Sequence, residues 1–231
     1  MKNKELMKLE KKYFNYICKM IEAHLGEILN QIGSYQNINS TADQGAKSNV
    51  YDSKLENIIE ALITRQLGWN ISVTPISADS CYECGDAIVH IDAKTRCEKV
   101  WNKKSGKYIP NTDFTGNKIV AEKNETTYDS KNEIIYKNEP WKANLSYYID
   151  HRFFGVVPNL TYFFVMDYDL DYNVIKIALV CLPHGQFREV FEDSILGAGK
   201  SKKGNIRFLV NEIIDNPEHE WRYKLIYSRK N

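Results

Sequence analysis

The chain has 231 residues, of which 43% are hydrophobic and 26% are charged, so we expect one globular domain with a full-sized core. Its 31 basic and 30 acidic residues leave a net charge of only +1, so any attraction to an acidic partner must come from local patches. No run of about 18 apolar residues occurs and the N-terminus MKNKELMKLEKKYF is charged, which argues against a membrane span or a secretory signal and favours a cytoplasmic protein.

Two amphipathic helices are predicted in the first third of the chain. Apolar residues recur at helical spacing from Glu5 to about Gly33, where the glycine predicts the end of the helix. The polar stretch 34–51 predicts a loop. A second apolar stripe predicts a helix from about Asp52 to Gln66, with Gly68 at the position of a C-terminal cap.

The rest of the chain predicts a sheet with few helices. Alternating and β-branched residues up to Thr95 predict a hairpin. Residues 98–140 are polar, and NETTYDSKNE within them (residues 124–133) predicts an irregular or edge segment, of the kind that often carries function. Two strands, at about 160–166 and 174–182, are apolar enough to be central in a sheet.

A helix near 205–215 and a strand at WRYKLIYS are predicted to close the chain. This order of helices, mixed sheet, helix and strand predicts an α/β or α+β fold. No linker divides the sequence, so we expect a single domain over 1–231, with a helical part over about 1–70 and a sheet core over about 70–231.

The predicted hairpin ISADSCYECGDAIVHIDAKT, residues 76–95, carries the chemistry. Side chains alternate along a strand, so His90, Asp92 and Lys94 should share one face. If Cys84 and Gly85 form the turn, residue 83 pairs with 86 and the register places Asp79 opposite His90 and diagonal to Asp92. Two carboxylates and an ammonium group would then lie together on one face of the sheet.

Such a trio suits metal-assisted phosphodiester hydrolysis. Mg²⁺ prefers carboxylate oxygens and keeps water and phosphate oxygens among its ligands. A neighbouring lysine can orient the attacking water and stabilise the negative charge that develops on the phosphate.

The residues AD at 78–79, a hairpin turn and IDAKT at 91–95 resemble the signature of PD-(D/E)xK nucleases, in particular of type II restriction endonucleases with Asp in the second position. Ala78 stands where the family usually has a proline that does not bind metal. The resemblance covers residues 76–95. It implies a restriction-endonuclease-like mixed central β-sheet flanked by α-helices, one or two Mg²⁺ ions per site, a homodimer, and hydrolysis that leaves a 5′-phosphate.

On this resemblance Asp79 and Asp92 would bind Mg²⁺ and Lys94 would position the attacking water. Many of these enzymes place a further acidic residue near the metal, and Glu56 or Glu60 of the preceding helix would supply it here. A solvated helix face is the alternative reading for both glutamates, and between them we favour Glu56.

Two further sets of residues leave alternatives open. Cys81 and Cys84 have zinc-ligand spacing, and His90 or Cys97 could complete a set, but no second CxxC exists, so free thiols near a turn are the simpler reading. Basic residues in two polar segments would contact a nucleic-acid backbone or belong to solvated loops. They are Lys99, Lys103, Lys104, Lys107, Lys200, Lys202, Lys203 and Arg207.

The sequence therefore favours a Mg²⁺-dependent type II restriction endonuclease that cuts double-stranded DNA. The alternatives are a repair or junction-resolving nuclease of the same fold, a non-catalytic nucleic-acid-binding module, and a small zinc-bound scaffold protein. Cleavage assays with DNA and metal analysis would separate them.

Overall fold

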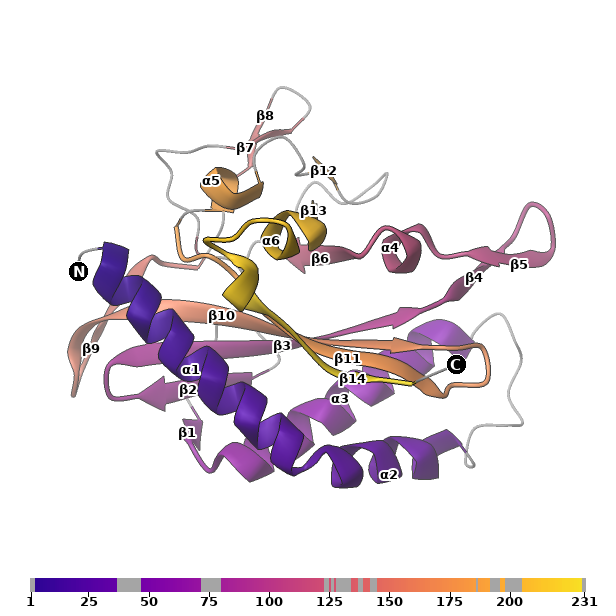
Figure 1. Ribbon diagram of the computed structural model, residues 1–231, viewed down its shortest axis with the longest axis horizontal. Helices are drawn as coiled ribbons and strands as arrows, with labels where there is room; N and C mark the ends of the chain where they lie inside the picture. Colours follow the sequence, from indigo (N-terminus) through magenta and orange to yellow (C-terminus); the bar gives the residue numbers. More distant parts are fainter. Residues whose placement is uncertain are drawn as a thin grey trace.

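A computed structural model gives the architecture as a mixed β-sheet between a layer of helices and a smaller layer of short strands and helices (Figure 1). The structure describes residues 3–36, 47–71, 80–122, 125, 127, 134–136, 139–141, 145–185, 187–191, 196–197 and 205–229. The helices are α1 (Asn3–Ala23), α2 (Leu25–Gln36), α3 (Lys47–Leu67), α4 (Thr112–Thr115), α5 (Phe187–Phe191), α6 (Asn211–Ile214) and the 3₁₀ helix η3 (Glu220–Arg222). None of the helices in these ranges is long and apolar enough to span a membrane.

The main sheet has the strand order β1-β2-β3-β10-β11-β14, and β9 pairs with the first part of β10. Its strands are β1 (Asn70–Ile71), β2 (Ser80–Cys84), β3 (Ala87–Cys97), β9 (Tyr148–His151), β10 (Gly155–Tyr168), β11 (Val174–Cys181) and β14 (Tyr223–Ser228). The central pair β3 and β10 is parallel, whereas the neighbouring pairs are antiparallel. The sheet is therefore mixed, as the sequence predicts.

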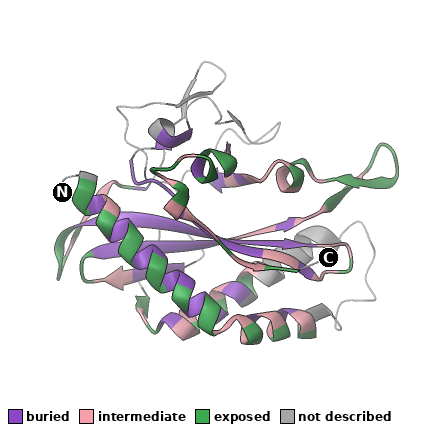
Figure 2. Cartoon of the chain, in the orientation of Figure 1, coloured by how far each residue is buried: buried purple, intermediate pink, exposed green. Residues whose placement is uncertain are grey.

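Side-chain alternation along β10 divides the core into two halves. Tyr162, Phe164 and Met166 point to the face covered by α1, α2 and α3, whereas Phe163 and Val165 point to the opposite face. Both sets are buried (Figure 2), which explains why this strand reads as a continuous apolar run.

A second layer covers the face of the sheet to which Phe163 points. It contains a three-stranded sheet of order β12-β13-β6, together with α5 and α6. The strands are β6 (Lys118–Glu122), β12 (Leu196–Gly197) and β13 (Asn205–Leu209), and two separate hairpins are formed by β4 (Lys99–Asn102) with β5 (Lys107–Pro110) and by β7 (Ile134–Tyr136) with β8 (Glu139–Trp141). Phe208 of β13 is fully buried against Phe163, Phe187 and Phe191.

The helical part agrees with the prediction except at its boundaries. The single helix predicted over Glu5–Gly33 is wrong: it is broken at His24 and continues to Gln36. The break has a packing reason, because α1 crosses β11 and β14 while α2 packs on α3. Gly68 has φ +61° directly after α3, so the predicted glycine cap is confirmed.

Of the predictions about the second half, the one for NETTYDSKNE falls on residues 124–133, which lie outside the described residues except for Glu125 and Thr127. The polar stretch before it contains β4, β5, α4 and β6. One prediction about the second half is wrong. The helix predicted near 205–215 is mainly strand β13, followed by the four residues of α6. Pairing of β13 with β6 decides its conformation, because it buries Ile206 and Phe208 in the second half of the core.

The central strands and the closing strand are confirmed. The predicted 160–166 and 174–182 lie within or close to β10 and β11, and WRYKLIYS contains β14. All five cysteines are free thiols, including Cys81 and Cys84 near the turn.

Candidate active site

Asp92 and Lys94 lie two residues apart on β3, one of the two central strands of the sheet. Lys94 Nζ lies 2.5 Å from Asp92 Oδ2. Both side chains point away from α1–α3, and Lys94 Nζ lies 5.2 Å from the ring centroid of Phe163. The prediction that the two residues project from one face is therefore confirmed.

A third charged residue, Glu125, completes this cluster. Its Oε1 lies 2.9 Å from Lys94 Nζ, and its Oε2 accepts a hydrogen bond of 2.8 Å from the backbone N–H of Glu122, at the end of β6. Sequence reasoning missed Glu125 because it lies 31 residues from Lys94 in a segment without periodicity. Only the position of β6 beside β13 in the second layer brings it to β3.

The cluster is buried and carries an excess of negative charge. Asp92 and Glu125 side chains are 4% and 5% exposed, and Lys94 is 19% exposed. Burial alone would lower the pKa of Lys94, but the two carboxylates outweigh it and raise that pKa well above its usual value. Burial also raises the pKa of Glu125, although Lys94 opposes this. Lys94 is thus held as a cation between two acids.

Two solved structures of restriction endonucleases have the same architecture. One is tetrameric SfiI bound to cognate DNA, with a TM-score of 0.64 and 13% identity over 100% of this chain and 88% of SfiI. The other is BglI bound to its DNA recognition sequence, with a TM-score of 0.69 and 13% identity over 97% of this chain and 91% of BglI. No model of a known protein family matches the sequence, and no curated protein matches it.

The chain has a restriction-endonuclease-like fold. This confirms the fold class expected from the hairpin. At 13% identity the likeness concerns the arrangement of the chain, so the roles of individual residues rest on the geometry of this molecule.

The hairpin that begins the restriction-endonuclease-like core has a different register from the predicted one. Gly85 and Asp86 form the turn, Cys84 pairs with Ala87, and Cys81 lies opposite His90. The predicted pairing of 83 with 86 is wrong because the turn lies one residue further along the chain than expected. In this turn the carboxylate of Asp86 accepts hydrogen bonds from Lys12 Nζ and Tyr13 Oη of α1. Asp79, the predicted partner of Asp92, lies outside the described residues.

The glutamates of α3 lie on the other side of the sheet. Thr95 Oγ1 donates a hydrogen bond of 3.2 Å to Glu56 Oε1, and Thr95 faces away from Lys94 because it is the next residue along β3. Glu60 lies one turn further along α3, near buried Tyr82; burial raises the pKa of Tyr82 and the charge of Glu60 adds to this. The fold brings Glu125, rather than either helix glutamate, to Asp92 and Lys94.

The zinc alternative lacks an assembled ligand set. His90 Nε2 forms a hydrogen bond of 2.9 Å with Asn159 Oδ1, and burial lowers the pKa of His90. Cys81 packs with Ile88 and Val157. In the ranges that the structure describes, no three His, Cys, Asp or Glu residues are grouped so that they could hold a metal ion.

The predicted nucleic-acid contacts have three different outcomes. Lys99, Lys103, Lys104 and Lys107 are exposed on the β4–β5 hairpin. Arg207 lies on β13, with its Nε 2.9 Å from Asp113 Oδ1. The remaining three, Lys200, Lys202 and Lys203, lie outside the described residues.

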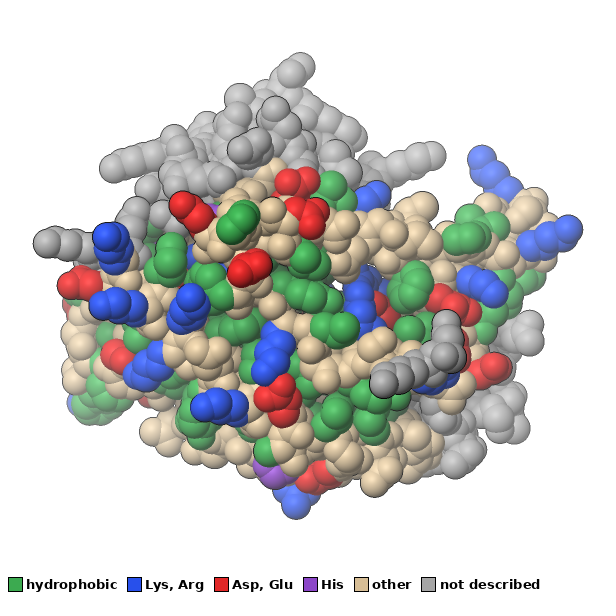
Figure 3. All heavy atoms as spheres, in the orientation of Figure 1, with side chains coloured by type: hydrophobic (Ala, Val, Ile, Leu, Met, Phe, Trp, Pro, Cys, Tyr) green, Lys and Arg blue, Asp and Glu red, His purple; other side chains and the backbone are tan. Residues whose placement is uncertain are grey.

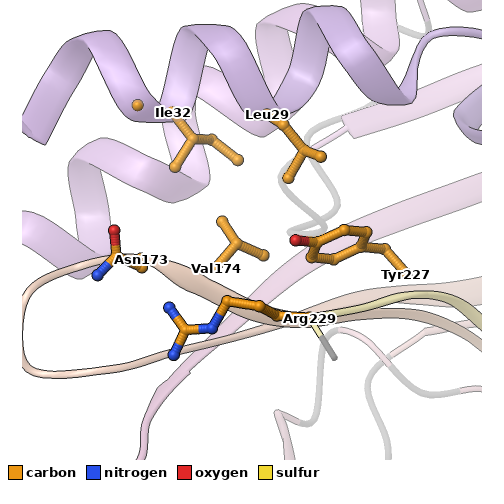
Figure 4. Close-up of a pocket in the computed structure, with 7 residues that line it drawn as sticks. Leu29, Ile32, Asn173, Val174, Tyr227 and Arg229 are labelled. Carbon is orange, nitrogen blue, oxygen red and sulfur yellow. The ribbon is translucent and has the colours of Figure 1, made fainter. Parts of the chain in front are cut away.

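A separate cavity of about 250 Å³ lies between α2 and the ends of β11 and β14 (Figure 4). Leu29 and Ile32 line its helical side, and Val174, Tyr227 and Arg229 line its sheet side. Leu29, Ile32, Val174 and Tyr227 belong to the half of the core on the helical face, so the cavity is not part of the Asp92–Lys94–Glu125 cluster.

Proposed function

We propose that the protein is a Mg²⁺-dependent type II restriction endonuclease that hydrolyses phosphodiester bonds of double-stranded DNA at a specific sequence and leaves 5′-phosphates. The observation that carries this proposal is the buried cluster of Asp92, Lys94 and Glu125 on and beside the central strand of a restriction-endonuclease-like fold. DNA as the substrate is supported by SfiI and BglI, both of which are bound to DNA in their solved structures.

The donor set fits Mg²⁺. Two carboxylates, Asp92 and Glu125, face a single ammonium group, so the cluster has room for further positive charge, and a hard cation prefers such oxygens. We propose Asp79 as a further ligand, because it directly precedes Ser80, which pairs with Ile91 beside Asp92. The chemistry that Mg²⁺ supplies when bound is Lewis-acid polarisation of the scissile phosphate.

The remaining steps belong to the chain itself. Lys94 is held as an ammonium group by its two acidic neighbours. It would therefore position the attacking water and stabilise negative charge on the phosphate. Because Lys94 is already protonated, it cannot take the proton of that water, which would pass to solvent as the water oxygen bonds to phosphorus and the P–O3′ bond breaks. Glu125 would keep Lys94 in position, since the backbone N–H of Glu122 fixes its second oxygen.

A cleavage assay with long DNA of known sequence tests the proposal. The protein is incubated with Mg²⁺ or with EDTA, beside Asp92→Asn, Lys94→Met and Asp79→Asn. Matched controls are Asp86→Asn and Lys12→Met. They make the same chemical changes in an exposed ion pair of 2.6 Å that lies six residues, about 20 Å, along the strand from Asp92.

Discrete Mg²⁺-dependent fragments that disappear in the Asp92, Lys94 and Asp79 variants, but remain in the two controls, are the expected result. Intact DNA under all conditions would overturn the proposal for duplex DNA. Branched substrates would then separate a junction-resolving nuclease of the same fold from a binding module, which would retain DNA affinity with no cleavage to lose.

We also propose that the enzyme acts as a homodimer, because one cluster for each strand would allow both strands of a duplex to be cut while the protein stays bound at one site. Sedimentation analysis of the purified chain at micromolar concentration should give twice the mass of the 26.9 kDa chain. A monomer both with and without DNA would contradict this part of the proposal.

A further inference from the structure

The β4–β5 hairpin projects from the body of the molecule as an arm, defined here as residues 99–110 (Figure 1). Its strands pair Val100 with Ile109 and Trp101 with Tyr108. Within the described residues, these two strands pair only with each other. A two-stranded ribbon of this kind is marginally stable alone, so its root needs support from the body.

The root of the arm is fixed to the strand that carries the candidate active site. Glu98 N–H donates to the carbonyl of Tyr168, and Asn111 N–H donates to the carbonyl of Glu98, both at 2.9 Å. The side chain of Asn111 donates to the carbonyl of Cys97 at 2.9 Å. Nearby, Arg96 forms a two-point ion pair with buried Asp167. The arm therefore has a defined direction relative to β3.

The surface of the arm is cationic. Residues 99–110 contain four lysines and no acidic residue. All four lysines are exposed, and Lys103, Lys104 and Lys107 form no ion pair with any part of the chain that the structure describes. Figure 3 shows these blue side chains beside green hydrophobic ones on the projecting arm. Unpaired cations on a projecting ribbon fit a polyanion.

Apolar side chains are exposed on both faces of the arm. Trp101 and Tyr108 share one face, with ring centroids 5.2 Å apart, and Val100 and Ile109 share the other. Each of the four is 38–44% exposed. A partner that contacts only lysines would leave this apolar surface in water, whereas a groove that surrounds a ribbon would cover both faces.

We propose that this arm enters the major groove of duplex DNA, with its lysines on the phosphates and its apolar side chains against base edges. The major groove admits a two-stranded ribbon and presents thymine methyl groups to apolar residues. Eleven residues separate Lys94 from Ser105 at the tip, at most about 36 Å of extended chain. This is about one turn of DNA, so a phosphate at Lys94 and a groove at the arm can belong to one site.

The inference rests on the proposed function for its substrate, but its test needs no catalysis. Binding of the full chain carrying Asp92→Asn to a fluorescent duplex is measured in EDTA at several salt concentrations. The arm variant replaces Lys103, Lys104 and Lys107 by Gln. The control variant replaces three exposed lysines of α1, Lys4, Lys8 and Lys19, by Gln, which is the same change of charge on the opposite layer.

We expect the arm variant to bind more weakly and its plot of log affinity against log salt to be shallower by about 3, since each lost phosphate contact removes about 0.9. The control should retain the original slope. Equal slopes for both variants would overturn the inference. If wild-type cleavage is nevertheless observed, the proposed function would stand without the arm.

Groove entry is tested by changing one apolar residue on each face, with Trp101→Ala and Ile109→Ala. At least one of them should reduce the preference for the cleaved sequence over random duplex by about 10-fold or more. Groove entry would be overturned if both variants kept the wild-type preference for the cleaved sequence. It would also be overturned if the full chain bound single-stranded DNA as tightly as duplex DNA.

Discussion

At the scale of single residues, Lys94 forms ion pairs with two buried carboxylates. Lys94→Met would leave Asp92 and Glu125 without their shared cation, and breaking a buried pair costs about 3 kcal/mol. A divalent cation that binds the same oxygens would replace the lost charge. We therefore expect the melting temperature of Lys94→Met to fall in EDTA and to recover in Mg²⁺ or Ca²⁺ by more than that of the wild type.

The exposed pair of Lys12 and Asp86 provides the control for this measurement. Lys12→Met removes an ammonium group of the same type from a carboxylate that is 49% exposed, so it should change stability by less than about 1 kcal/mol with no added response to divalent ions. An equal response of both variants to Mg²⁺ would argue against metal ligands at Asp92 and Glu125.

Gly185 is a second residue whose identity is fixed by its surroundings. It has φ +65°, and a Cβ built there would overlap the phenol ring of Tyr147. Gly106, at the tip of the arm, has nearly the same φ, +62°, but open space around it. Gly185→Ala should therefore lower the free energy of unfolding by about 3 kcal/mol and Gly106→Ala by about 1 kcal/mol, as measured by urea denaturation. An equal loss of unfolding free energy in both variants would show that the positive φ alone, and not the overlap with Tyr147, makes alanine unfavourable at Gly185.

At the scale of elements, a buried ion pair attaches α1 to the 3₁₀ helix before β14. Arg222 Nη2 lies 2.7 Å from Glu10 Oε2, with side chains 0% and 3% exposed. Glu10 Oε1 also accepts the backbone N–H of His184 after β11. One carboxylate thus connects three segments that are far apart in the sequence.

Breaking this connection from one side should cost more than removing it from both. Glu10→Gln and Arg222→Met each leave one buried charge without its partner, and each should lower the free energy of unfolding by about 3–5 kcal/mol. The double variant should lose clearly less than the two single losses together, because it buries no charge. Urea denaturation of the four proteins measures this coupling, and strictly additive losses would contradict it.

The elements also differ in how far the sequence determines them. β10 and β11 were predictable because each is an apolar run long enough for a central strand. β13 was not predictable, because the five residues NIRFL form a strand by pairing with β6, which lies far away in the sequence. The turn of the β2–β3 hairpin likewise contacts a distant segment, because Lys12 and Tyr13 of α1 donate hydrogen bonds to Asp86.

For the whole molecule, local pattern was sufficient for the fold class and for part of the site. The alternation of β3 places Asp92 beside Lys94 whatever the rest of the chain does. Glu125 and the separation of Glu56 onto the helical face depend on which layers cover the sheet. Such contacts between distant segments leave no spacing in the sequence from which they could be predicted.

Acid sensitivity should also be a property of the whole molecule, because two histidines are buried in it. Burial lowers the pKa of His90 and of His184, whose Nε2 atoms bond to Asn159 Oδ1 and the carbonyl of Tyr147. Below about pH 6.5 these two histidines bind protons in the unfolded chain but remain neutral in the native protein. The free energy of unfolding should therefore fall as pH decreases from about 6.5 towards the native pKa values, by up to about 1.4 kcal/mol per pH unit for each histidine.

His90→Gln isolates one of these contributions, because glutamine can still donate a hydrogen bond to Asn159. Urea denaturation at pH 7.5, 6.5 and 5.5 should give a shallower loss of stability for this variant than for the wild type, by up to one proton. His24→Gln, in the partly exposed turn between α1 and α2, is the matched control for loss of a histidine. If His90→Gln kept the full wild-type dependence on pH, the buried neutral imidazole of His90 would not be a source of acid sensitivity, and His184 and the carboxylates would have to account for it.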